Sequence, residues 1–188
     1  GRATLDIIKQ QTGSFKVQGL VCRDNIELLN EQIQNFKPEY VCVFDESLKS
    51  DVKFPRKRLF IGMKGIKDLV GMDVDIVMNA MPGSIGLEPT VEALRNDKIL
   101  ALANKESMVM AGRIVRRLLK EGKASLIPVD SEHSALYQVM KVSERGDLKR
   151  LIITASGGPF REYNKTRLRH VKPRDALNHP TWKMGAKI

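Results

Sequence analysis

Residues 99–129, ILALANKESMVMAGRIVRRLLKEGKASLIPV, contain one complete strand-helix-strand repeat. Residues 99–103 and 124–129 are short apolar runs of a length typical of buried strands. Between them, residues 107–121 have the period of an amphipathic helix, because one face carries Met108, Ala111, Val115, Leu118 and Leu119 and the other carries Arg113, Arg116, Arg117 and Lys120. The stretch therefore predicts two parallel strands joined by a crossover helix.

The same alternation extends towards the N-terminus. Further strand-like runs cover residues 15–21, 40–44, 58–61 and 75–79, and amphipathic helices are predicted at 25–36 and 87–96. Asp24 and Glu27 form a capping-box-like pair before the first of these helices, and Pro89 lies near the first turn of the second. The sequence thus predicts an α/β fold with a parallel sheet covered on both faces.

The pattern changes near Val129. A helix to Met140, a charged hairpin-like segment at 141–149 and a strand at 150–154 are predicted, before Gly157-Gly158-Pro159 interrupts the chain. We therefore place a domain boundary here, with residues 1–129 in one domain and 130–188 in a second.

The composition, with 42% hydrophobic and 29% charged residues over 188 positions, is that of a globular protein. No apolar run is long enough to cross a membrane and no signal peptide is recognisable, so we expect a cytoplasmic protein without a membrane partner. Cys22 and Cys42 lie in apolar runs without metal-ligand spacing, which predicts buried, reduced thiols. The net charge of +10 suits phosphate ligands, although much of it lies on the solvated helix face described above.

Two carboxylates, Asp130 and Glu132, follow the apolar run that ends at Val129. If that run continues as a strand, its period of two places both carboxylates on the same side. Such a pair suits a hard divalent cation, Mg²⁺ or Mn²⁺, with coordination positions left for substrate oxygens. The alternative is that Asp130 or Ser131 only caps the next helix, whose apolar face contains Ala135, Leu136, Val139 and Met140.

Polar loops follow several other predicted strands, and a doubly wound sheet binds its ligand at such strand ends. Arg23 and Asp24 lie where such folds contact the adenosine ribose of a dinucleotide. Arg23 would pair with a 2′-phosphate, Asp24 would bind a 2′-hydroxyl, and helix capping by Asp24 is an equal alternative. The two glycines of residues 81–86 permit close backbone approach to a ligand, or form an ordinary turn. Residues 104–107 place an amide, an ammonium and a carboxylate at one helix start.

The C-terminal part contains two more candidate loops. Ser156 precedes two glycines, and a hydroxyl beside successive backbone N–H groups suits a phosphate. Residues 179–185 include His179 and Trp182 among helix breakers, a composition suited to a lid, although a core-anchoring Trp182 is the alternative. The basic residues at 165–174 raise the possibility of a nucleic-acid-binding module, but the aromatic content of 5% and the absence of a recognisable motif argue against it.

Four motifs, in order along the chain, resemble those of the 1-deoxy-D-xylulose 5-phosphate reductoisomerase family. They are ANKES at 103–107, PVDSEH at 128–133, SGGPFR at 156–161, and His179-Pro180 followed by Trp182, Met184 and Gly185. The resemblance covers the whole chain. It implies a Rossmann-like NADPH-binding domain that lacks its first strand, followed by the start of an α+β catalytic domain with a flexible loop.

The resemblance also implies a reaction, the NADPH-dependent and Mn²⁺- or Mg²⁺-dependent conversion of 1-deoxy-D-xylulose 5-phosphate to 2-C-methyl-D-erythritol 4-phosphate in non-mevalonate isoprenoid biosynthesis. Asp130 and Glu132 would bind the metal, and Lys105 and Glu132 would be catalytic. The phosphorylated sugar would contact Lys105, Ser131, Glu132, Ser156, His179, Trp182 and Met184. The cofactor would contact Gly1, Arg23, Asp24, Asn25, Asn104, Glu106 and Gly185. The full-length protein is expected to be a homodimer with no nucleic-acid partner.

Some positions depart from the family pattern. Cys22-Arg23-Asp24-Asn25 replaces a segment that usually contains small residues or glycine, so Asn25 transfers more safely than Arg23 or Asp24. The family also has a glycine-rich loop before Gly1 and a third carboxylate ligand after Ile188, so we expect a fragment that is inactive alone. The competing enzyme class is another NAD(P)-dependent oxidoreductase of a phosphorylated sugar, which leaves the carboxylate pair and the two C-terminal loops unexplained.

Overall fold

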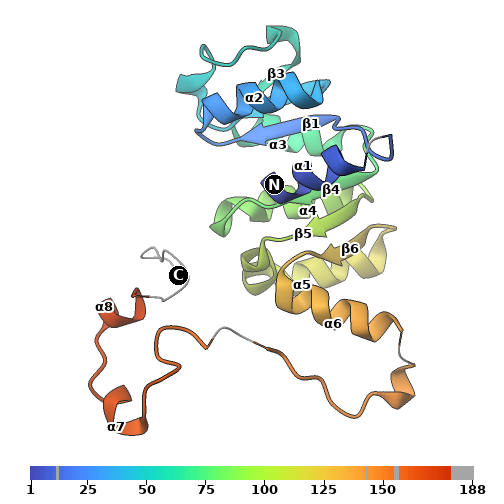
Figure 1. Ribbon diagram of the computed structural model, residues 1–188. Helices are drawn as coiled ribbons and strands as arrows, with labels where there is room; N and C mark the ends of the chain where they lie inside the picture. The colour runs from blue at the N-terminus through green and yellow to red at the C-terminus, as the bar shows by residue number, and fades with distance from the viewer. Residues whose placement is uncertain (12, 143, 155–156, 179–188) are drawn as a thin grey trace. The chain divides into compact units, whose positions relative to one another are not determined.

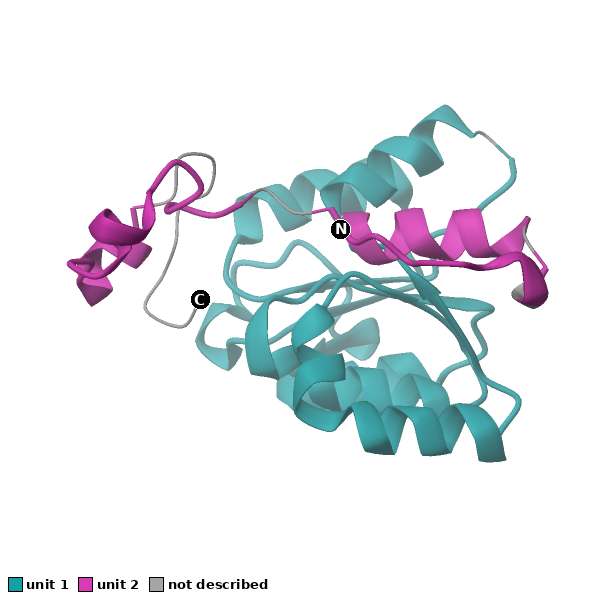
Figure 2. Cartoon of the chain, turned by 90° about the horizontal axis from the view of Figure 1, so that it is seen from below, with its two compact units in different colours: residues 1–130 teal, residues 131–188 magenta. Residues whose placement is uncertain are grey.

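The computed structural model describes residues 1–11, 13–142, 144–154 and 157–178. The chain divides into two compact units, Gly1–Asp130 and Ser131–Ile188 (Figure 2). The cofactor-binding and catalytic roles that the sequence suggests for the two parts of the chain stay predictions.

The first unit contains two three-stranded parallel sheets (Figure 1). One has the order β1 (Gly19–Cys22), β2 (Tyr40–Val43), β3 (Leu59–Ile61). The other has the order β4 (Ile76–Asn79), β5 (Ile99–Leu102), β6 (Ser125–Pro128). All neighbouring strands are parallel, so the predicted α/β fold is confirmed.

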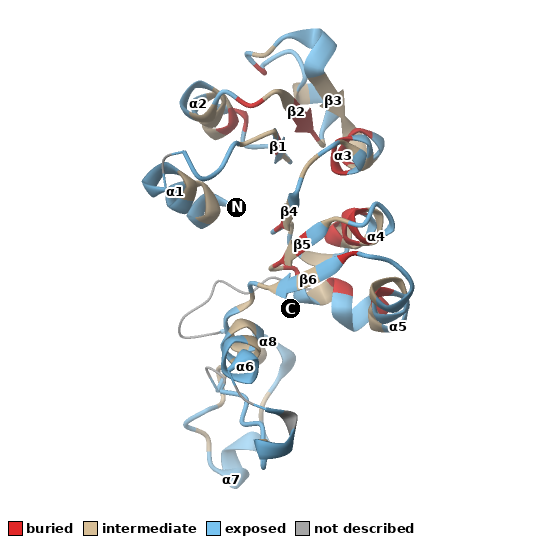
Figure 3. Cartoon of the chain, turned by 90° about the vertical axis from the view of Figure 1, so that its right-hand side faces the viewer, coloured by how far each residue is buried: buried red, intermediate tan, exposed pale blue. Residues whose placement is uncertain are grey.

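Helices cover both faces of the first sheet, whereas those of the first unit cover only one face of the second (Figure 3). On one side lie α1 (Arg2–Gln10) and α2 (Ile26–Phe36), and on the other lie α3 (Gly62–Gly71), α4 (Leu87–Arg95) and α5 (Lys105–Glu121). Short 3₁₀ turns, η1 (Glu46–Leu48), η2 (Arg56–Arg58) and η3 (Gly83–Gly86), lie in the loops. The predicted coverage of both faces holds for the first sheet only. On the second sheet Ile76, Ile99 and Ile127 are 46%, 37% and 38% exposed.

The hydrophobic core is shared between the two sheets. Val41, Cys42 and Val43 of the central strand β2 are each 0% exposed, and successive residues of a strand face opposite sides. The valines pack with Leu20, Ile26, Leu29 and Val52. The thiol of Cys42 belongs to a larger cluster with Ile66, Leu69, Val70, Ala93, Leu94, Leu100, Leu102, Val115 and Ala124. This cluster takes residues from both sheets and from the three helices on one side, so it joins the two sheets.

Helix α5 has the predicted amphipathic character with one correction. Ala111 and Val115 are buried, and the four cationic residues of the opposite face are exposed. Met108, predicted on the core face, is 37% exposed. The helix is kinked at Ala111, where φ is −136° and ψ is 26°, and the buried position of its first turn is Ser107.

The two cysteines differ in burial. Both are free thiols, and Cys42 is buried as predicted, whereas Cys22 is only half-buried. Burial raises the pKa of Cys42 to about 12, and burial also raises the pKa of Cys22 while its thiol donates to the carbonyl of Asn25 at 3.3 Å.

We expect iodoacetamide to modify Cys22 of the native protein well before Cys42. The thiolate is the reactive form, and Cys42 is both fully covered and protonated at neutral pH. Peptide mass spectrometry after timed alkylation measures the two rates. Alkylation of both cysteines should become faster in urea. Equal alkylation rates for Cys22 and Cys42 in the folded protein would contradict the burial of β2.

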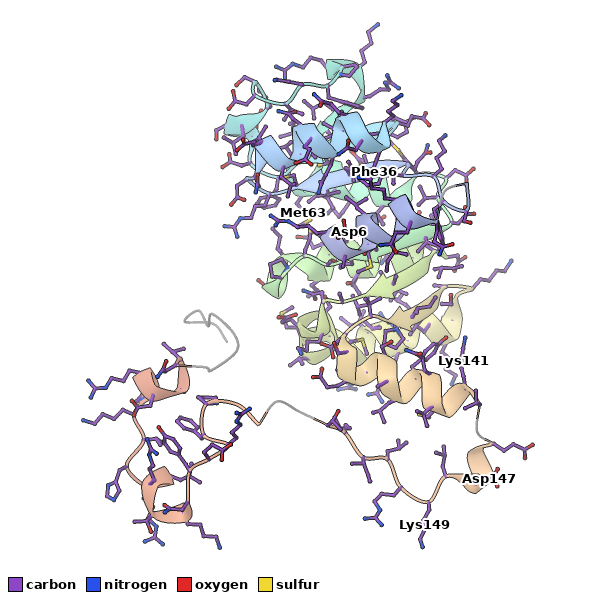
Figure 4. All side chains as sticks on the ribbon, viewed as in Figure 1. Asp6, Phe36, Met63, Lys141, Asp147 and Lys149 are labelled. Carbon is purple, nitrogen blue, oxygen red and sulfur yellow. The ribbon has the colours of Figure 1, made fainter. Side chains whose placement is uncertain are left out.

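The second unit is built from short elements. They are α6 (Ser131–Lys141), η4 (Arg145–Asp147), α7 (Lys165–Leu168) and α8 (Pro173–Ala176). The predicted helix to Met140 is confirmed, but none of its residues is buried. The charged segment after it forms the turn η4 instead of a hairpin, and Asp147 and Lys149 project from the chain (Figure 4).

The predicted strand at 150–154 is wrong. These residues have no regular structure, and Leu151, Ile152 and Ile153 are 51%, 69% and 65% exposed. An apolar run forms a strand only where another strand pairs with it, and no described strand does so. Across the described part of the chain, every helix is too short or too polar to span a membrane.

Candidate active site at the strand ends

The second sheet brings three chain segments together at one edge. Asn79, Leu102 and Pro128 are aligned as register partners at the ends of β4, β5 and β6. Because parallel strands in register end at the same edge of a sheet, the loop after β4, the start of α5 and the residues after β6 are neighbours. Asn104, Lys105 and Asp130, all in the first unit, therefore belong to one region.

Asn104 fixes the start of α5. Its side-chain oxygen accepts a hydrogen bond from the backbone N–H of Ser107 at 2.8 Å, which makes it the N-cap of the helix. Its amide nitrogen donates to the carbonyls of Met81 and, at 2.9 Å, Gly83. The predicted contact of Asn104 with a cofactor stays a prediction, and the structure gives this side chain the role of holding the β4–α4 loop.

The loop after β4 depends on its glycines. Gly83 has φ of +71°, a conformation that favours glycine. A Cβ atom on Gly86 would lie 2.7 Å from the side chain of Asn104, so glycine is required for the loop to approach the start of α5. Of the two glycines noted in the sequence, Gly83 thus permits the turn and Gly86 permits close packing between protein segments.

Lys105 and Asp130 form an ion pair at this edge. The Lys105 Nζ lies 2.8 Å from the Asp130 Oδ2, with the two side chains 55% and 13% exposed. Lys105 is the first residue of α5 and Asp130 follows β6, so the alignment of β5 with β6 places them together. The structure therefore joins a predicted catalytic residue to a predicted metal ligand, and the ammonium holds the carboxylate at the site.

The strand argument for the carboxylate pair is wrong. Strand β6 ends at Pro128, Asp130 lies in a bend, and Ser131 and Glu132 form the first turn of α6 in the second unit. The backbone N–H of Val129 still donates to the carbonyl of Leu102 at 2.9 Å, but the chain cannot continue as a strand because α6 begins at Ser131. The metal prediction now rests only on two carboxylates that are two positions apart along the chain.

The donor types fit a hard cation. Both Asp130 and Glu132 offer carboxylate oxygens, the ligands that Mg²⁺ and Mn²⁺ prefer. No group of three or more histidine, cysteine or acidic side chains with metal-binding geometry occurs among the described residues. The described pair would thus leave most coordination positions to water, substrate or other ligands.

A second group of predicted residues follows β1. Arg23 and Asp24 are largely exposed, and the Arg23 Nε lies 3.8 Å from the Asp24 Oδ2. Asn25 caps α2, because its side chain accepts from the N–H of Leu28 at 3.1 Å. The predicted capping by Asp24 is therefore wrong by one residue, which leaves the Asp24 carboxylate outside the helix end.

A small pocket of about 50 Å³ connects this loop with the one after β4. Its walls are Val21, Cys22, Arg23, Phe44, Ile66, Met81, Pro82 and Ile85. These residues lie at or just beyond the carboxyl ends of β1, β2 and β4 or come from α3, and ligands bind at such strand ends in this fold class. A larger open depression of about 890 Å³ follows the exposed side of α5 from Met108 to Arg117, and none of the predicted site residues lines it.

The other predicted residues are placed as follows. Gly1 is the exposed N-cap of α1, and Glu106 is half-buried in the first turn of α5. Five predicted contacts lie outside the described residues, namely Ser156, His179, Trp182, Met184 and Gly185.

Two residues of this region escaped the sequence interpretation. Asn79 is 2% exposed at the end of β4, and Thr90 is 0% exposed in α4. The sequence did offer a signal for both residues. Asn79 is a polar residue at the end of an apolar strand, and Thr90 lies one helical turn after Leu87, on the helix face that packs on the sheet.

Comparison with known families gives matches along nearly the whole chain. The sequence model described as 1-deoxy-D-xylulose 5-phosphate reductoisomerase matches residues 1–112, and that of the C-terminal domain of 1-deoxy-D-xylulose 5-phosphate reductoisomerase matches residues 126–188. The enzymes of this name from Thermoanaerobacter sp. (strain X514) and Chlorobium phaeobacteroides (strain BS1) are 46% and 43% identical over 191 and 193 residues. These alignments include 100% of this chain and 50% of each relative, so the chain spans about half the length of the curated relatives it matches.

Solved structures agree. The crystal structure of a DOX-P reductoisomerase in complex with NADPH, fosmidomycin and magnesium has a TM-score of 0.79 at 30% identity, over 100% of this chain and 50% of that one. The reductoisomerase of Zymomonas mobilis in complex with NADPH has a TM-score of 0.82 at 33% identity, over 94% of this chain and 48% of that one.

Proposed function

Because the chain belongs to the 1-deoxy-D-xylulose 5-phosphate reductoisomerase family, we propose that the full-length protein converts 1-deoxy-D-xylulose 5-phosphate to 2-C-methyl-D-erythritol 4-phosphate with NADPH and Mg²⁺ or Mn²⁺. The single observation that supports it best is the pairing of Lys105 with Asp130 at the strand ends. The pair lies beside Asn104, in the region where this fold class binds its ligands.

In this proposal Asp130 and Glu132 hold the cation and Lys105 binds the substrate. A bound divalent cation would polarise two neighbouring substrate oxygens, and NADPH would supply the hydride. The ammonium of Lys105 keeps the Asp130 carboxylate in place, and it can donate to a substrate oxygen without leaving the site. Glu132, in the first turn of α6, would accept a proton or bind a substrate hydroxyl.

The remaining residues of the proposal would contact other parts of the substrate and the cofactor. Ser156 and His179 would contact the substrate phosphate, with Ser131 nearer the reacting carbons. Trp182 and Met184 would exclude water from the reacting atoms. Gly1, Arg23, Asp24, Asn25, Asn104, Glu106 and Gly185 would surround the cofactor. We further propose a cytoplasmic homodimer, as the resemblance in the sequence implies.

The test is NADPH consumption by the purified full-length protein. We expect the absorbance of NADPH to fall only when both 1-deoxy-D-xylulose 5-phosphate and Mg²⁺ or Mn²⁺ are present, because the substrate oxygens need the cation. EDTA should stop the reaction, and added Mg²⁺ should restore it. Consumption with other sugar phosphates but not with this one would favour the competing oxidoreductase class.

A further inference from the structure

Four buried polar side chains lie behind the candidate site. Asn79, Thr90, Asn104 and Ser107 are 2%, 0%, 2% and 0% exposed. They come from the end of β4, from α4 and from the start of α5, and neither substrate nor cation is proposed to touch Thr90 or Ser107. Buried polar groups in proteins are almost always hydrogen-bonded, so the partners of these four side chains indicate what they hold in place.

Their hydrogen bonds form a closed ring. The Asn79 amide donates to the Thr90 hydroxyl at 2.8 Å, and the Thr90 and Ser107 hydroxyls lie 3.3 Å apart. The Ser107 hydroxyl donates to the side-chain oxygen of Asn104, and the Asn104 amide donates to the carbonyl of Met81. The backbone N–H of Met81 then donates to the side-chain oxygen of Asn79 at 3.2 Å, which closes the ring.

Every link of the ring runs in the same direction. The amide nitrogens of Asn79 and Asn104 each face a second acceptor, the carbonyls of Gly86 at 2.8 Å and Gly83 at 2.9 Å, so neither amide can be flipped. With both amides fixed, Thr90 must accept from Asn79 and donate to Ser107. A hydrogen-bonded ring with one possible orientation holds its members more rigidly than separate bonds.

The ring has one member that also lines the small pocket between the loops after β1 and β4. Both backbone polar groups of Met81 are used by the ring, and Met81 forms a wall of the small pocket together with Pro82 and Ile85. The opposite side of the ring is the first turn of α5, which begins at Lys105. The ring therefore connects the pocket wall to the helix that carries Lys105.

We propose that Thr90 and Ser107 are positioning residues that fix the loop 81–86 against the start of α5 and thereby set the affinity for NADPH. This inference rests on the proposed function, because it takes the pocket as the cofactor site. Neither residue contacts the cofactor itself. Their effect passes through Asn79, Asn104 and Met81.

The test compares Thr90→Val with Thr90→Ser in the full-length protein. Valine has the shape of threonine but breaks the ring, whereas serine keeps the hydroxyl. We expect Thr90→Val to weaken NADPH binding by up to about tenfold in the absence of substrate, the limit reached when the cost of one lost buried hydrogen bond falls wholly on the NADPH-bound state. KM for NADPH should rise by a similar factor while kcat at saturating NADPH changes much less, and Thr90→Ser should restore both. Thr166→Val, the same change at an exposed position of α7, is the matched control and should leave NADPH binding unaltered.

Three outcomes separate the possibilities. If Thr90→Val melts earlier but binds NADPH like the unchanged protein, the ring serves stability alone and the proposal is overturned. If the unchanged protein binds no NADPH, the proposed function fails and this inference fails with it. If Thr90→Val does not fold, Ser107→Ala breaks the ring at another link, and unaltered NADPH binding by that variant overturns the proposal.

Discussion

Asp130→Asn is expected to lower kcat/KM of the full-length protein for 1-deoxy-D-xylulose 5-phosphate roughly 100-fold or more, as loss of a metal-binding carboxylate predicts. Asparagine keeps the size of the side chain but removes the charge that is proposed to bind the cation and that pairs with Lys105 at 2.8 Å. Steady-state NADPH oxidation across a range of Mg²⁺ and Mn²⁺ concentrations measures the effect.

The control for this variant is Asp147→Asn. Asp147 is an exposed carboxylate in η4, so its loss should change kcat/KM by less than about twofold. The proposed role of Asp130 is wrong if its asparagine variant keeps an activity close to that of the control at every cation concentration. A loss that high Mn²⁺ reverses would instead show that Asp130 contributes to cation affinity more than to the reaction itself.

The largest effect on stability is expected for Leu100→Ala. Leu100 is 0% exposed in β5, within the cluster that joins the two sheets. Truncating such a leucine removes apolar contacts and leaves a cavity, which costs about 2–5 kcal/mol of unfolding free energy. Urea denaturation followed by circular dichroism measures this loss.

Leu151→Ala is the matched control for Leu100→Ala. The side chain of Leu151 is 51% exposed in a segment without regular structure, so the same truncation should cost less than about 0.5 kcal/mol. Equal losses for the two leucines would contradict the core described for the first unit.

The strands and the fold class could be predicted from the sequence because both depend on local pattern. Apolar runs between amphipathic stretches predicted all six strands of the first unit. The first strand begins later than expected, at Gly19, because pairing with Tyr40 starts there. The false strand at 150–154 has the right composition, but pairing depends on a partner that composition does not supply.

The candidate site was predicted in part. Its residue types and its place at strand ends followed from the motifs, whereas the contact between Lys105 and Asp130 depends on the alignment of β5 with β6. The ring through Asn79 and Thr90 was missed because it closes only after two helices have packed on the sheet. The capping error between Asp24 and Asn25 has a smaller cause, because both residue types cap helices equally well.

The sharing of one core by two sheets bears on how the molecule melts. Among the described strands, no strand of one sheet is hydrogen-bonded to a strand of the other. If strand pairing were the only link, each sheet could therefore unfold independently. Cys42 of β2 and Leu100 of β5 nevertheless belong to the same buried cluster, and exposing one side of that cluster exposes the other. The first unit should therefore unfold as a single cooperative block, with slow-exchanging amides of β2 and β5 reporting the same opening free energy.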